Sequence, residues 1–133
     1  MNIKKKILIV LIYALSFGSL HAIEPDIFVQ STVNRASETL SKNLSKEEKI
    51  NELKKIAIET VDIKGLAFYT LGPIRKSLTE NQKKEYSDLF RNYFLKSFSS
   101  RLAEYTNPEI DVLGKEVLNE NYTIVNSLLK AKD

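Results

Sequence analysis

The segment from Glu80 to Glu104 carries more apolar side chains than a helix on a protein surface needs. Thr79 and Gln82 form a capping box in front of it, so the pattern predicts a helix over 80–104. Placed at 100° steps, its apolar residues cover an arc of roughly 240°, whereas packing on one surface needs little more than ~100°. These residues are Tyr86, Leu89, Phe90, Tyr93, Phe94, Leu95, Phe98, Leu102 and Tyr105. We expect this helix to be covered on two sides.

Arg101 falls inside the apolar arc, and two interpretations of it stay open. Its guanidinium can extend along the apolar surface to reach water at the rim. Alternatively, it contacts an anionic headgroup. The first interpretation is favoured because it needs no ligand.

Three shorter helices are predicted in front of this one, over residues 25–41, 46–60 and 62–71. Pro25 suits the first turn of a helix, where its missing N–H costs nothing. Ser45 and Glu48 form a capping box, and Asp62 is a suitable N-cap. Gly72 and the proline after it end the third helix, because glycine can take a left-handed conformation and proline cannot continue the helix. Gly65 weakens that helix in its interior.

After Pro108 the periodicity changes from helical to alternating. Ile110 and Val112 alternate with acidic residues, and the segment from Tyr122 to Leu129 is rich in β-branched and aromatic residues. A turn over 119–121 separates two predicted antiparallel strands, 109–118 and 122–130. Four helices followed by a hairpin make an α+β domain. A two-stranded ribbon is marginally stable unless a helix or further strands cover it.

The first residues have the layout of a secretory signal peptide. Three lysines at positions 4–6 precede an apolar run, 7–20, that ends in Leu20-His21-Ala22. The run is shorter than the ~20 residues that span a bilayer. We therefore expect a leader over 1–22, cleaved after Ala22, and one domain over 23–133. The chain has no cysteine to carry a lipid, so a soluble periplasmic location is expected.

The expected exported domain has little to offer for catalysis. The leader holds three of the 20 basic residues and none of the 17 acidic ones, so the rest is formally neutral and its net charge gives no argument for nucleic acid or for an anionic membrane surface. His21 and Met1 are the only residues of their kinds, and Cys and Trp are absent. We expect no enzyme, no catalytic residues, no metal and no cofactor. A hydrolase built on carboxylates is disfavoured, because the acids alternate with lysines along predicted helix surfaces.

The order and spacing of several residues resemble a known family. Asp62 opens a short helix ending in Leu71-Gly72, and Thr79-x-x-Gln82-Lys83 begins a long helix with aromatic residues, after which strands follow. This arrangement, over 29–129 and behind a leader, resembles the MlaC family of periplasmic phospholipid-binding proteins, also called the toluene-tolerance or Tgt family. The aromatic residues concerned are Tyr86, Phe90 and Tyr105.

The resemblance implies an NTF-like α+β fold in which a curved sheet and helices enclose an apolar cavity for the acyl chains of one phospholipid. It implies a carrier between an outer-membrane lipoprotein–porin complex and an inner-membrane ABC transporter with its MlaD ring. The implied role is the maintenance of outer-membrane lipid asymmetry. The residues expected to line the cavity are Ile63, Leu66, Phe68, Phe90, Phe94, Phe98, Ile110, Val112, Ile124 and Leu128.

The chain departs from the family pattern in two places. Arg75 stands where members often have a tryptophan, three residues after the Leu-Gly pair. The later strands and a final helix of the family are missing, so we expect a truncated form. From the residues alone, an ordinary core is the favoured explanation of the aromatic set. The alternative function is a periplasmic helical adaptor that binds another protein without lipid.

Overall fold

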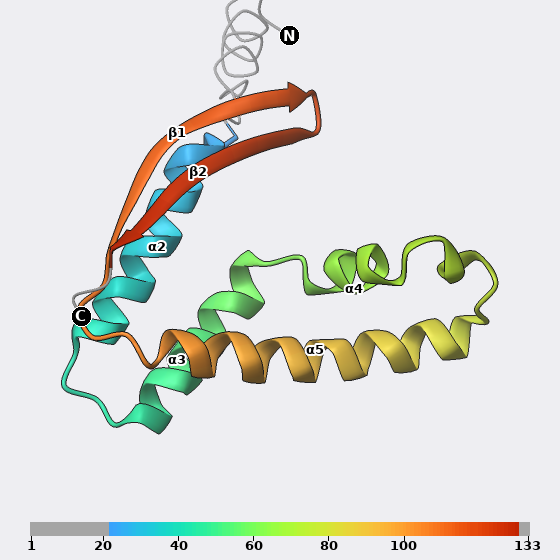
Figure 1. Ribbon diagram of the computed structural model, residues 1–133, viewed down its shortest axis with the longest axis horizontal. Helices are drawn as coiled ribbons and strands as arrows, with labels where there is room; N and C mark the ends of the chain where they lie inside the picture. Colours follow the sequence, from blue (N-terminus) through green and yellow to red (C-terminus); the bar gives the residue numbers. More distant parts are fainter. Residues whose placement is uncertain (1–21, 131–133) are drawn as a thin grey trace, which may run out of the picture.

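The computed structural model describes residues 22–130 and shows four α-helices followed by a β-hairpin (Figure 1). The predicted α+β class is therefore confirmed. The expected signal peptide lies, apart from Ala22, outside the described residues. The elements are α2 (Pro25–Ser41), α3 (Lys46–Thr60), α4 (Ile63–Leu71), the 3-10 helix η1 (Gly72–Lys76), α5 (Glu80–Leu102), β1 (Glu109–Asn119) and β2 (Tyr122–Lys130).

Both predicted capping boxes are present, which explains why α3 and α5 begin where the sequence indicated. The Glu48 N–H donates to Ser45 Oγ at 3.3 Å, and the Ser45 N–H donates back to the Glu48 carboxylate at 2.8 Å. Thr79 and Gln82 make the same reciprocal pair at 3.2 and 2.9 Å. Each box gives partners to N–H groups that the first turn of a helix leaves unpaired.

The ends of α5 and β1 differ slightly from the predicted ones. Helix α5 ends at Leu102 instead of Glu104, because the next turns tighten: the N–H of Tyr105 bonds to the Leu102 carbonyl three residues back. Strand β1 continues to Asn119, whose side chain accepts the Asn121 N–H at 2.9 Å and so shapes the hairpin turn.

The cap of the short helix α4 lies against a glycine that the sequence marked only as a weak point. The Asp62 carboxylate caps α4 by accepting the Gly65 N–H at 2.9 Å. A Cβ at position 65 would lie 2.2 Å from Asp62 Oδ2. At the other end Gly72 has a φ of 55°, as expected of a glycine that ends a helix. The chain then continues as η1, which the sequence did not predict.

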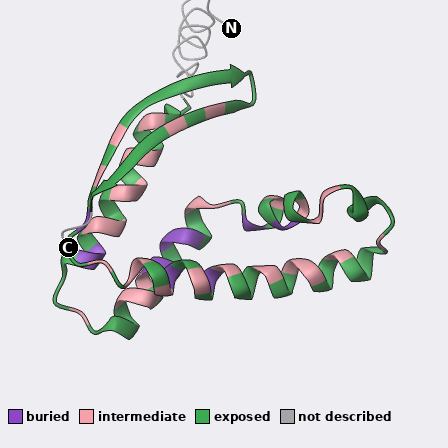
Figure 2. Ribbon diagram, in the orientation of Figure 1, coloured by how far each residue is buried: buried purple, intermediate pink, exposed green. Residues whose placement is uncertain are grey.

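The core lies where α3, α4 and α5 meet. Ala57, Ile63 and Leu95 form a buried cluster, one from each helix, and Phe90 and Phe94 pack against it. Helix α5 contacts both α3 and α4, but Leu89 and Tyr93 of the predicted apolar arc are exposed, so the helix is covered less fully than the sequence suggested. In Figure 2 the buried residues concentrate at this junction, whereas most of the hairpin is exposed.

The hairpin packs on α2 through one of its two faces. Strands β1 and β2 are antiparallel, with Ile110 opposite Leu129, Val112 opposite Ser127 and, after a register shift, Lys115 opposite Val125. Because paired residues share a face, these residues lie together on one side. Lys115 on that side contacts Glu24 and Asp26 at the start of α2. Helix α2 thus supplies the cover that a two-stranded ribbon needs.

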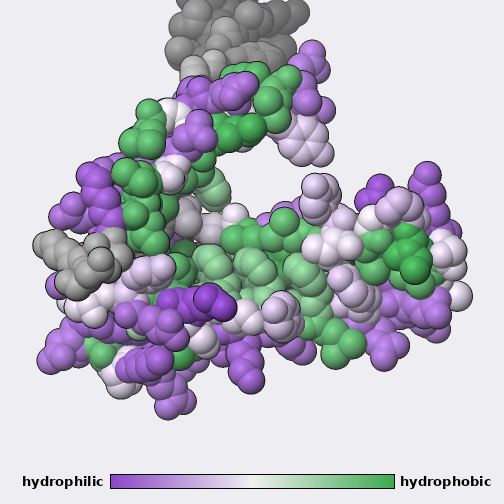
Figure 3. All heavy atoms as spheres, in the orientation of Figure 1, coloured by the Kyte–Doolittle hydropathy of each residue, from purple (hydrophilic) through white to green (hydrophobic). Residues whose placement is uncertain are grey.

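Two arms face each other across an open hollow, as the space-filling view shows (Figure 3). One arm is the hairpin with α2, and the other is the α4–α5 pair. Apolar residues gather along the part of the second arm that borders the hollow. Among residues 22–130, no helix combines the length and the apolar character of a membrane span.

Candidate functional site

Four aromatic side chains on α5 stack into a continuous strip, which we call the aromatic row: Tyr86, Phe90, Phe94 and Phe98. Successive ring centroids lie 6.2, 6.1 and 5.3 Å apart, with interplanar angles of 26°, 14° and 11°. Residues four apart lie on the same side of a helix, so the rings follow one another along α5. With a rise of 1.5 Å per residue, the row extends over about 18 Å.

The row is supported by protein along one side and accessible along the other. Phe90 and Phe94 are half-buried against the core cluster, whereas Phe98 is 38% exposed. At the opposite end the hydroxyl groups of Tyr86 and Thr70 lie 2.9 Å apart and share a hydrogen bond. The row therefore has an apolar middle, an accessible apolar end and a polar end.

The structure brings Phe90, Phe94 and Phe98 together, as the helical spacing predicted. It places the three α4 candidates differently. Ile63 is buried in the core between α3 and α5, where it supports the row from behind. Leu66 is exposed, and Phe68 is half-buried with the Lys64 ammonium 5.7 Å from its ring centre.

The four strand candidates do not come together on one face. Ile110 and Val112 belong to the face that packs on α2. Ile124 pairs with Glu116, and Leu128 pairs with Asp111, so both lie on the opposite, exposed face. The physical reason is the register of the hairpin. Ile110 and Val112 pair with the odd-numbered Leu129 and Ser127 of β2, so the even-numbered positions of β2 lie on the other face.

Tyr86 is the member of the row that sequence reasoning left out of the site. It was included in the apolar arc, and it precedes Phe90 by four residues. That spacing was a sufficient signal to add its ring to the row. Its hydroxyl partner Thr70 could not be inferred, because α4 and α5 meet only through tertiary packing.

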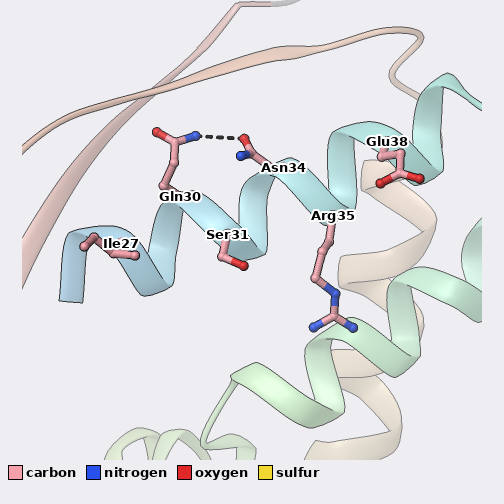
Figure 4. Close-up of a pocket in the computed structure, with 6 residues that line it drawn as sticks. All are labelled: Ile27, Gln30, Ser31, Asn34, Arg35 and Glu38. Atoms are coloured by element: carbon pink, nitrogen blue, oxygen red, sulfur yellow. Dashed lines mark hydrogen bonds between the residues drawn. The ribbon is translucent and has the colours of Figure 1, made fainter. Parts of the chain in front are cut away.

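A separate pocket of about 410 Å³ opens along α2 (Figure 4). Gln30 donates to the Asn34 side chain at 2.8 Å, and Arg35 is paired with Glu59 of α3 at 2.6 Å. Apart from Ile27, the labelled side chains are polar. This lining suits hydrocarbon poorly, because burying polar groups without new partners is unfavourable.

The shifted pKa values belong to surface ion pairs and caps. The hydrogen bond from Lys83 lowers the pKa of Glu80, and the hydrogen bond to Asp111 raises the pKa of Lys130. Hydrogen bonds from Ser45 lower the pKa of Glu48 in its capping box. Within residues 22–130, no group of three or more His, Cys, Asp or Glu side chains is placed to hold a metal ion.

The fold and the aromatic row together define an α+β domain that presents a long apolar strip on its longest helix. The family model described as MlaC protein matches residues 30–133 of this chain. The chain therefore belongs to the MlaC family, and the resemblance inferred from its residues is confirmed. No curated protein matches the chain, and no solved structure matches it.

Proposed function

We propose that this protein is a periplasmic phospholipid carrier that holds acyl chains against the aromatic row and performs no bond chemistry. Membership of the MlaC family supports a phospholipid-binding periplasmic protein. The observation that carries the proposal is the row itself, with its stacked and partly accessible rings.

The size of the row suits an acyl chain. A bilayer's hydrocarbon core is about 30 Å thick, so a chain in one leaflet extends over roughly 15 Å, close to the ~18 Å of the row. Removing one methylene from water contributes about 0.8 kcal/mol. A chain that lies along the whole row is therefore bound appreciably even when its outer side stays uncovered.

The polar end of the row gives a bound lipid an orientation. Thr70 donates its O–H to the Ala67 carbonyl at 2.7 Å, so Tyr86 donates its own O–H to Thr70. The Tyr86 oxygen can still accept a hydrogen bond, for example from an ammonium donor in a headgroup. In this arrangement the acyl chain runs from Tyr86 toward Phe98, and the headgroup stays near water beyond Tyr86.

The proposed route follows from the family. A leader over 1–22 directs export and is removed after Ala22, leaving a domain over 23–133. The carrier then exchanges phospholipid with an outer-membrane lipoprotein–porin complex and with an inner-membrane ABC transporter that carries an MlaD ring. A lipid needs such a carrier because its acyl chains are unfavourable in water.

Mass spectrometry of bound lipid tests the proposal. The full chain, purified from periplasm, is expected to release phospholipid on organic extraction and to show a lipid-bound mass under native conditions. The Phe98→Gln variant is expected to lose about tenfold in occupancy, equivalent to ~1.4 kcal/mol, because it places an amide in the row. The Ile58→Gln variant is the matched control, since Ile58 is 46% exposed on α3.

Two results would contradict the proposal. One is wild-type protein that is folded by circular dichroism and carries no phospholipid. The other is equal lipid occupancy in the Phe98→Gln and wild-type proteins. A lipid-free protein that purifies in a stable complex with another protein would support the alternative function, the helical adaptor.

A further inference from the structure

The outer end of the α4–α5 pair combines exposed apolar and basic side chains. Ile74 is 58% exposed and Leu89 is 62% exposed, and both line a shallow depression of about 340 Å³ together with Leu78. Arg75 and Lys76 follow Ile74 directly in η1 and are exposed. We call these five residues the tip patch. Figure 1 shows η1 at the end of the α4–α5 pair that is farthest from α2.

The arm that ends in the tip patch is basic, although the expected mature chain is neutral. Residues 63–101 contain eight basic and three acidic residues, whereas residues 23–62 and 102–133 together contain nine basic and fourteen acidic ones. The acidic Glu85 also lines the depression. Lys83 and Lys84 are paired with Glu80 and Asp88. Among residues 22–130, no ion pair includes Arg75 or Lys76.

We propose that the tip patch docks this protein on the surface of an anionic lipid bilayer. Apolar side chains beside cations on a protruding tip suit the membrane interface: the apolar groups enter between headgroups and the cations approach phosphates. Because Arg75 directly follows the exposed Ile74, the apolar contact and the charged contact lie side by side. A protein partner is disfavoured, because the tip patch is shallow and protruding, not a groove that would enclose a peptide.

The proposed docking site and the proposed lipid site share one residue, Tyr86. Its ring begins the aromatic row, and the same residue lines the depression of the tip patch. The polar end of the row therefore opens where the protein would meet the membrane. Docking itself does not depend on a lipid held in the row, so either proposal can fail while the other stands.

Vesicle flotation with the full mature chain tests the docking proposal. Vesicles of phosphatidylethanolamine with phosphatidylglycerol are expected to carry the protein to the top of a gradient, and vesicles of phosphatidylcholine alone are not. Added salt should weaken binding, because it screens exposed charges. The double variant Arg75→Glu/Lys76→Glu should lower the bound fraction at least tenfold, and Ile74→Ser should lower it severalfold.

The matched control is Lys46→Glu/Lys54→Glu on α3, which changes the net charge by the same amount and should float like the wild type. Circular dichroism checks that each variant is folded. The proposal is overturned if wild-type protein ignores anionic vesicles, or if the two charge-reversed variants bind equally. It is also overturned if the tip variant loses only a protein partner. Phospholipid occupancy of the tip variant after purification should match the wild type, which separates a docking defect from a carriage defect.

Discussion

Lys115 of β1 donates to Asp26 in the first turn of α2, with 2.8 Å between Nζ and Oδ1. The same ammonium also contacts Glu24. The hydrogen bond between Lys115 and Asp26 is the main cause of the lowered pKa of Asp26. The same bond, together with the bond to Glu24, raises the pKa of Lys115. The ion cluster thus joins the hairpin to the start of the first described helix.

Replacing Lys115 by Met should loosen the hairpin without unfolding the three-helix core. The substitution keeps the apolar stem of the side chain and removes the ammonium that joins β1 to α2. Hydrogen exchange should become faster for the amides of β1 and β2 and stay unchanged for buried amides of α3. The control is Lys130→Met, since Lys130 pairs with Asp111 inside the hairpin. Equal exchange in both variants would show that the ion cluster does not hold the hairpin.

The packing of the hairpin on α2 should depend on pH in two separate ranges. The pKa of Asp26 is lowered from 3.8, so its contribution is present above that value and is lost as pH falls through the lowered pKa. The pKa of Lys115 is raised from 10.5, so its contribution is present below that value and is lost as pH rises through the raised pKa. Hairpin amide chemical shifts should stay constant between these limits and change beyond them. In Lys115→Met both changes should shrink.

Removing the N-cap of α5 should destabilise the whole domain. Thr79→Ala leaves the Gln82 N–H without its side-chain acceptor, and such losses typically cost about 1 kcal/mol. Urea unfolding should show a lower midpoint with an unchanged slope. Thr106→Ala, an exposed substitution in the loop before β1, should leave the midpoint unchanged. A midpoint for Thr79→Ala equal to that of the control would mean that the capping box contributes nothing.

Alanine at position 65 should fail to stabilise α4, although alanine favours helices by up to about 1 kcal/mol over glycine. The new Cβ would meet the Asp62 carboxylate at 2.2 Å and displace the cap. A double-mutant cycle with Asp62→Ala measures this coupling. Gly65→Ala should be neutral or destabilising in the wild type and stabilising once Asp62 is replaced. Equal effects in both backgrounds would rule out the clash.

The Tyr86 hydroxyl can be removed without disturbing the ring stack. Tyr86→Phe keeps the contact with Phe90 and abolishes the hydrogen bond to Thr70. If the hydroxyl marks the polar end of a bound lipid, phospholipid occupancy should fall by a few fold. Thermal unfolding of the lipid-free protein should change little, because a single exposed hydrogen bond contributes modestly. Unchanged occupancy would remove the hydroxyl from the proposed site.

The sequence predicted well those features that depend on neighbours along the chain. Ser45 with Glu48 and Thr79 with Gln82 mark helix starts because capping is a contact between residues three apart. The stacking of Phe90, Phe94 and Phe98 follows equally from their spacing of four. Features that need distant contacts were missed. Alternation within each strand could not show that Val112 and Ile124 lie on opposite faces, because the register joins residues far apart.

The local sequence pattern also could not predict which of the candidate residues are buried. Ile63 and Leu66 are both apolar and three residues apart, yet the first lies in the core and the second is exposed. Which face of α4 meets α5 depends on the whole three-helix packing. The 3-10 conformation of η1 after Gly72 likewise had no clear signal.

Helix α2 is covered by a hairpin that lies far from it in the sequence, and this affects the order in which the domain folds. Helix α2 contacts α3, and α3 and α4 both contact α5; such relatively local contacts form quickly. Asp26 and Lys115 are 89 positions apart, so the side of α2 that faces the hairpin is covered only after the strands have formed. Until the hairpin closes, this side of α2 stays open to water and to other chains.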